Sequence, residues 1–119
     1  MAIVVGHLST AEGSEALGAA VAEARRRGTE LVLVTGSPDG ASSELDALAE
    51  RLAGAGVAHR VVPGTGDLAD DLVRTAAESG AELIVIGLRR RSPVGKLILG
   101  SGAQRILLDA PCPVLAVKP

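Results

Sequence analysis

Residues 87–101 read Gly87-Leu-Arg-Arg-Arg-Ser-Pro-Val-Gly-Lys-Leu-Ile-Leu-Gly-Ser101, with four basic side chains spaced among three glycines. The run before them, Glu82-Leu-Ile-Val-Ile86, is typical of a buried strand, and the run after them, Gly102 to Ala110, is typical of a helix. No acidic residue lies between Leu83 and Leu108. Glycine lets the main chain approach a ligand closely, and a helix N-terminus carries partial positive charge. This order of segments therefore predicts a phosphate-binding loop.

Outward from this loop, short apolar runs alternate with helical patterns along the chain. One helical pattern places Leu17, Ala20, Val21 and Ala24 on a single face, at the spacing i, i+3, i+4 and i+7. Such alternation predicts an α/β fold of the Rossmann-like type, a doubly wound, five-stranded parallel sheet with helices on both faces. Right-handed crossovers restrict the strand order to a few options. The expected strands are Ala2–Val5, Glu30–Thr35, Val57–Pro63, Leu83–Ile86 and Pro113–Val117.

Several local signals mark where the elements begin and end. The pattern Ser9-x-x-Glu12 is a capping box that opens the first helix, Asp67 is a plausible N-cap of the third helix, and Gly80 stops that helix. The expected third strand contains His59 and Arg60, and this polarity suits the edge of the sheet. In the last helix, the spacing predicts that Ile106 and Leu107 point inward.

The composition excludes several classes of protein. At 119 residues, we expect one domain covering residues 1–119. The chain contains no Phe, Tyr or Trp, so its core is aliphatic and it cannot stack bases as single-strand nucleic-acid platforms do. A net charge of −2 gives no overall attraction to nucleic acid or to anionic membranes. The single Cys112 excludes an internal disulfide and is expected to be a small buried hydrophobe. Without a signal peptide or a membrane-length apolar run, we expect a cytoplasmic protein.

The fold class also predicts where a ligand binds. In a doubly wound sheet, ligands bind at the carboxyl ends of the strands where the winding reverses. If the strand order is 3-2-1-4-5, the first and fourth strands are neighbours at that point. The segments that meet there are Gly6-His7-Leu8-Ser9, Val34-Thr35-Gly36 and residues 87–101. A nucleotide could place its phosphates on the basic loop and its base between the first and second strands.

Each candidate residue of this cleft also has a structural interpretation. The Ser101 hydroxyl could bind phosphate, but Ser101-x-x-Gln104 is itself a capping box, and one geometry can serve both roles. Residues 89–91, three arginines, could clamp phosphates or could solvate the loop. Gly95-Lys96 lacks the earlier glycine and the following Ser or Thr of a P-loop, and the first strand lacks a dinucleotide fingerprint.

Catalytic and metal sites have little support in the sequence. His7 and Ser9 could form a nucleophilic pair, but nothing in the sequence places the orienting acid or the oxyanion hole that such a pair needs. His59 is expected to be a surface residue. Two isolated histidines without ligand spacing do not predict a metal site.

Taken together, these motifs resemble the universal stress protein family over essentially the whole sequence. The resemblance, to the single-domain bacterial type with an adenine-nucleotide alpha hydrolase-like fold, implies strand order 3-2-1-4-5, a homodimer, and ATP bound at the switch point in many members. It implies a role in stress response or regulation rather than a defined catalytic turnover. The matching segments are Gly6-His7-Leu8-Ser9, Gly64, Leu83-Ile-Val-Ile-Gly87, Gly100-Ser101, Gln104-Arg-Ile-Leu-Leu108 and Ala110-Pro-Cys-Pro-Val-Leu-Ala-Val117.

Two positions depart from the pattern of the family's ATP binders, G-x2-G-x9-G-[ST]. Gly87, Gly100 and Ser101 match it, but Arg90 replaces the second glycine. Arg90 adds side-chain bulk where glycine allows close approach, although its charge could compensate on the phosphates. His7 stands where the family binders place an aspartate that contacts adenosine, and losing that acceptor weakens adenosine recognition.

These motifs support three hypotheses for function. The first is a regulatory module that binds ATP, with Mg²⁺, or a related nucleotide. The second is a stress-family dimer that binds no nucleotide and acts through protein partners, and the third is a slow phosphotransfer or ATP-hydrolysing enzyme. The homodimer is expected to form through Val114–Val117, an apolar edge strand that must be covered. The residues predicted to bind nucleotide are Gly6, His7, Ser9, Val34, Thr35, Gly87, Arg89, Arg90, Gly100, Ser101 and Gly102.

Overall fold

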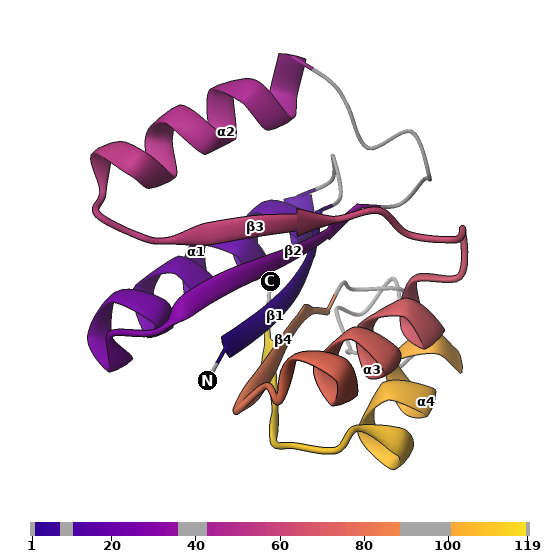
Figure 1. Ribbon diagram of the computed structural model, residues 1–119. Helices are drawn as coiled ribbons and strands as arrows, with labels where there is room; N and C mark the ends of the chain where they lie inside the picture. The colour runs from indigo at the N-terminus through magenta and orange to yellow at the C-terminus, as the bar shows by residue number, and fades with distance from the viewer. Residues whose placement is uncertain (1, 8–10, 36–42, 89–100, 119) are drawn as a thin grey trace.

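The computed structural model describes residues 2–7, 11–35, 43–88 and 101–118, in which strands and helices alternate. The strands form one parallel sheet in the order β3-β2-β1-β4-β5, with α1 and α2 on one face and α3 and α4 on the other (Figure 1). The predicted α/β fold and its strand order are therefore confirmed. The elements are β1 (Ala2–His7), α1 (Ala11–Arg27), β2 (Glu30–Thr35), α2 (Ser43–Gly54), β3 (His59–Val62), α3 (Leu68–Ser79), β4 (Leu83–Gly87), α4 (Ser101–Asp109) and β5 (Val114–Val117).

The three central strands, β1, β2 and β4, carry an aliphatic core on both faces of the sheet. Successive side chains of a strand point to opposite faces, so Ile3 and Val5 pack with the residues of α1 and α2, whereas Val4 packs with those of α3 and α4. All three side chains are fully buried. Burial on both faces explains why these strands are continuous apolar runs rather than alternating ones.

The boundaries of β1 and β3 differ from the expected ones by one or two residues. Strand β1 extends to His7 because its pairing with β2 continues to the register pair His7–Thr35. The expected third strand, Val57–Pro63, is shorter in the structure, where β3 is confined to His59–Val62 and, among the described strands, pairs only with β2. This edge position is the one that its polarity predicted.

The predicted helix ends of α3 are confirmed, whereas the prediction for one residue of α4 was wrong. The Asp67 carboxylate caps α3 by accepting a hydrogen bond from the Asp70 N–H, and Gly80 ends the helix in the left-handed conformation, with φ of 62°. In α4, Ile106 is buried, but Leu107 is 44% exposed. Consecutive residues of a helix point about 100° apart, and the narrow buried face of α4 accommodates only the first of them. In the described part of the chain, no helix is both long and apolar enough to cross a membrane.

Candidate functional site

The carboxyl edge of the sheet brings together the predicted residues that lie on strands. In the register of β1 and β2, Gly6 lies beside Val34 and His7 lies beside Thr35. Strand β4 runs alongside β1 and ends at Gly87. Helix α1, the element after β1, packs on one face of the sheet, and α4, the element after β4, packs on the other, so the winding reverses between these two strands (Figure 1). This is the position at which doubly wound sheets bind ligands.

The remaining predicted residues divide between the start of α4 and segments outside the described residues. Ser101 is the first residue of α4 and is exposed, and Gly102 follows it half-buried. Four of the predicted positions lie outside the described residues, as does most of the basic loop, of which the structure describes only the two ends. These four are Ser9, Arg89, Arg90 and Gly100.

The first turn of α3 contacts both the end of β1 and the start of α4. A Cβ atom built on Gly6 would lie 3.0 Å from the Leu68 Cδ1 atom, so the Leu68 side chain packs directly on the end of β1. A Cβ atom built on Gly102 would lie 3.8 Å from the Ala69 Cβ atom, which is an ordinary contact distance. The N-terminus of α4 therefore lies beside Ala69, the residue after the one that contacts β1, at the carboxyl edge of the sheet.

An ion pair also joins the N-cap residue of α3 to Arg105, in the middle of α4. The Arg105 Nη2 atom lies 3.0 Å from Asp67 Oδ1 and 3.1 Å from Asp67 Oδ2. Two hydrogen bonds lower the pKa of the Asp67 carboxyl, and the one from the Asp70 N–H has a larger effect than the one from Arg105. One carboxylate thus caps α3 and anchors α4. Because both side chains are about half exposed, the pair orients the helices more than it stabilises the fold.

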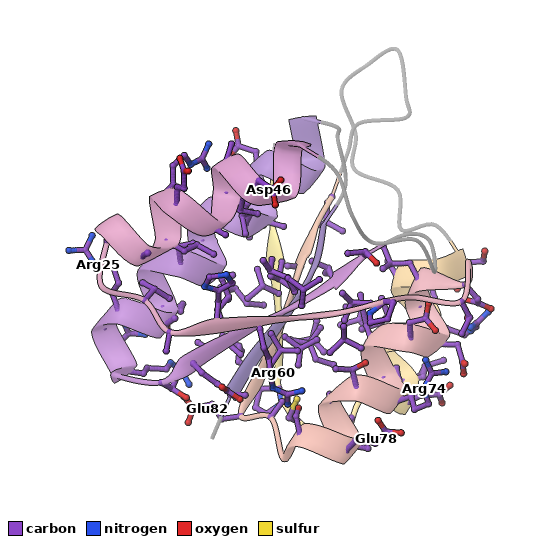
Figure 2. All side chains as sticks on the ribbon, turned by 45° about the horizontal axis from the view of Figure 1, so that its top comes forward. Arg25, Asp46, Arg60, Arg74, Glu78 and Glu82 are labelled. Carbon is purple, nitrogen blue, oxygen red and sulfur yellow. The ribbon has the colours of Figure 1, made fainter. Side chains whose placement is uncertain are left out.

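A buried carboxylate organises the turn between β3 and α3. Asp71 is 1% exposed, and its Oδ2 atom accepts the Thr65 N–H at 2.7 Å. Its Oδ1 atom accepts the Thr65 hydroxyl and the Arg74 guanidinium, each at 2.8 Å. Figure 2 places Arg74 on α3. Burial by itself raises the pKa of Asp71, but the hydrogen bonds from Thr65 and Arg74 outweigh it, so the pKa is lowered and the group stays ionised.

The same turn is attached to the end of β2. The Gly64 N–H donates to the Thr35 Oγ1 atom at 3.3 Å. A Cβ atom built on Gly64 would lie 2.1 Å from the Thr35 carbonyl oxygen and 2.8 Å from Asp71 Oδ2. The Gly64 backbone therefore occupies a space that no other residue type fits without displacing main chain. The turn therefore lies against Thr35 at the end of β2, and the other neighbour of Thr35 in the sheet is His7 of β1.

Sequence reasoning missed Thr65, Asp71 and Arg74. A signal for Asp71 was nevertheless present, because Leu68, Asp71, Leu72 and Thr75 have the spacing of one helix face. Two polar residues on an otherwise apolar face indicate a buried hydrogen-bond site, and both Asp71 and Thr75 are indeed buried.

The described edge offers hydrogen-bonding groups rather than metal ligands. Within residues 2–7, 11–35, 43–88 and 101–118, no group of three or more His, Cys, Asp or Glu side chains could hold a metal ion. At the described part of this edge, the exposed Ser101 hydroxyl and the first N–H groups of α4 are such hydrogen-bonding groups. Such groups can bind an anion at one end of a ligand.

Comparison with known proteins identifies the family of this chain. The model of the universal stress protein family matches residues 36–118. A universal stress protein of Mycolicibacterium smegmatis is 40% identical over 98% of this chain and 97% of its own length. The universal stress protein of Archaeoglobus fulgidus in complex with dAMP is 28% identical, with a TM-score of 0.69 over 99% of this chain and 98% of that one. A universal stress protein in complex with cAMP is 26% identical, with a TM-score of 0.74 over 98% and 95%. The chain therefore belongs to the universal stress protein family.

Proposed function

We propose that this protein binds an adenine nucleotide at the carboxyl edge of the sheet and acts as a regulatory module without a dedicated catalytic turnover. The observation that carries the proposal is the reversal of winding between β1 and β4, with the N-terminus of α4 held beside it through Leu68 and Ala69. Two family members of this fold bind dAMP and cAMP. In this proposal, the phosphates lie at Ser101 and the basic loop, and the base lies over the ends of β1 and β2.

ATP, held with Mg²⁺, is the nucleotide that we propose to test first. The basic loop supplies three arginines and a lysine for a chain of phosphates. Arg90 and His7 are departures from the pattern of the family's ATP binders, so AMP belongs in the same titration. If Arg90 compensates for the missing glycine by its charge, ATP binds more tightly than AMP.

The test is calorimetric titration with Mg-ATP, because a chain without aromatic residues gives no useful intrinsic fluorescence. We expect saturable binding, and we expect Ser101→Ala to weaken it about tenfold, since a hydrogen bond to a charged group contributes about 1.5 kcal/mol. Ser79→Ala is the matched control, because the Ser79 hydroxyl donates to the Thr75 carbonyl near the end of α3 and should not affect the ligand. A flat titration at millimolar nucleotide would instead favour a dimer that acts through protein partners.

We also propose that the protein forms a homodimer through β5. This strand is at an edge of the described sheet, and Leu115 is 37% exposed. The Pro113 carbonyl accepts from the Ile84 N–H of β4, and the Val117 carbonyl accepts from the Leu88 N–H just after β4. The alternate residues Val114 and Ala116 therefore direct their backbone groups outward. Antiparallel pairing with the β5 strand of a second copy would satisfy those groups.

Ala116→Pro is expected to dissociate this dimer while leaving the subunit folded. Proline removes the outward N–H of residue 116 without changing the residues that pair with β4. Two-fold symmetry removes the donor twice, so the dimer should weaken at least about 30-fold, at about 1 kcal/mol for each hydrogen bond. Sedimentation analysis measures the oligomeric state, and circular dichroism verifies folding. Leu115→Pro, which blocks pairing with β4, should instead unfold the edge. A folded Ala116→Pro variant that remains dimeric would place the interface elsewhere.

A further inference from the structure

The geometry points to Asp71 as a positioning residue of the nucleotide site, one that sets affinity for the base and sugar of the ligand rather than for its phosphates. This inference rests on the proposed function and deepens it. Asp71 is not among the residues that the sequence suggested as ligand contacts. It acts through the turn that it holds, Gly64-Thr65, which lies against the end of β2.

The contacts of Asp71 leave the turn little freedom. Both oxygens are engaged, by the Thr65 N–H, the Thr65 hydroxyl and the Arg74 guanidinium, at 2.7 to 2.8 Å. Burying a carboxylate is costly unless such partners are present. An asparagine of the same shape would turn an NH₂ group toward one of these donors, so at least one contact must be lost. The turn is thus specified by the charge of the carboxylate as well as by its shape.

The position of the turn assigns it to one half of the site. The Gly64 N–H donates to Thr35 at the end of β2, and β2 is one of the two strands over whose ends the base is proposed to lie. The phosphate half is held by other contacts, the ion pair between Arg105 and Asp67 and the packing of Gly102 on Ala69. Both sets of contacts involve α3, but the Asp71 carboxylate contacts Thr65 and Arg74 instead of α4, so we expect a change at Asp71 to affect mainly the base half.

A buried carboxylate is also a poor choice if stability is all that this position provides. Asp71 lies on the helix face that contributes Leu72 and Ala76 to the core. An apolar residue at such a position avoids the desolvation cost of a charge, and replacing buried ionic groups with apolar ones is often neutral or stabilising. The carboxylate provides what an apolar residue cannot, namely a fixed conformation of the turn after β3.

The experiment measures the Kd of adenosine and of ATP for the full chain and for Asp71→Asn, at a temperature where circular dichroism shows the variant folded. We expect Asp71→Asn to raise the Kd of both ligands by the same factor, about tenfold, since both ligands lose the same contacts to the base and sugar. Ser101→Ala should raise the Kd of ATP and leave the Kd of adenosine unchanged. Asp70→Asn is the matched control, because the Asp70 carboxylate pairs with the same Arg74 but is exposed, and it should change neither Kd.

The outcomes separate the role of Asp71 from the proposed function. If the unmodified chain binds neither ligand, the proposed function is wrong and the role of Asp71 falls with it. If the unmodified chain binds adenosine and folded Asp71→Asn binds it equally well, only the role of Asp71 is overturned. Should Asp71→Asn fail to fold, Thr65→Val removes one of the three contacts with an isosteric side chain. This variant is expected to raise the Kd of adenosine about threefold, and an unchanged Kd would again overturn the inference.

Discussion

Replacing Gly64 with alanine is expected to lower the free energy of unfolding by about 3 kcal/mol, the upper part of the usual range for overpacking a buried position. The added Cβ atom would lie 2.1 Å from the Thr35 carbonyl oxygen and 2.8 Å from Asp71 Oδ2. Neither neighbour is the flexible end of a long side chain. One is main chain at the end of a central strand, and the other is a carboxylate with three hydrogen bonds, so the turn itself must move.

The matched control is Gly18→Ala, which adds the same methyl group in the middle of α1. A Cβ atom there meets nothing within 4 Å, so we expect a gain of about 0.5 to 1 kcal/mol from the better helix propensity of alanine. Urea unfolding followed by circular dichroism measures both changes. Equal stability of Gly64→Ala and the unmodified chain would mean that the turn after β3 does not lie against Thr35. If the nucleotide site is where we propose, Gly64→Ala should also weaken binding.

Gly64 illustrates what a sequence cannot reveal about a turn. The pattern Gly64-Thr-Gly66 predicts a turn, and both glycines fit that prediction, but they are required for different reasons. Gly66 has a φ of 107°, a conformation that favours glycine and is a local property. Gly64 does not have a positive φ; it is required because Thr35, 29 residues earlier, passes close to it. Only the folded structure brings that neighbour into place.

The two adjacent aspartates of α3 show that a sequence also cannot reveal which of two neighbouring helix residues is buried. Asp70 and Asp71 are identical in type and consecutive in sequence, yet Asp70 is exposed and Asp71 is buried. The rotation of about 100° per residue separates them, and the position of the sheet decides which one points inward. The error at Leu107 has the same cause, since the narrow contact of α4 buries Ile106 and leaves its neighbour exposed.

The strands were predictable because their signal is local. A strand buried on both faces must be apolar at nearly every position, so β2 was expected at Glu30–Thr35 and is found there. The alternation of strands and helices then determined the fold class, and the rule for switch points placed Gly6, His7, Thr35 and Gly87 at one edge. What the rule does not supply is the set of contacts among Thr65, Asp71 and Arg74, because those contacts join a turn to the helix after it.

Leu72→Ala is expected to be the most destabilising truncation in this part of the molecule, at about 3 to 4 kcal/mol, the middle of the range for deleting a buried leucine side chain. Leu72 is 2% exposed and belongs to the buried cluster that joins α3 to the sheet, with Val4 and Ile84. Its removal leaves a cavity between the helix that carries Asp71 and the strands that carry the candidate site.

Leu108→Ala removes the same atoms from a side chain that is 84% exposed, and it should change stability by no more than about 0.5 kcal/mol. Because Leu72→Ala and Leu108→Ala remove the same atoms, a difference in their effects on stability comes from the difference in burial between the two leucines. Urea unfolding at several protein concentrations gives both values and separates dissociation of the proposed dimer from unfolding. If the two truncations cost the same, α3 is not packed on the sheet through Leu72. The first turn of α3 would then have no rigid support, and neither Leu68 on Gly6 nor Asp71 at Thr65 could hold the site in place.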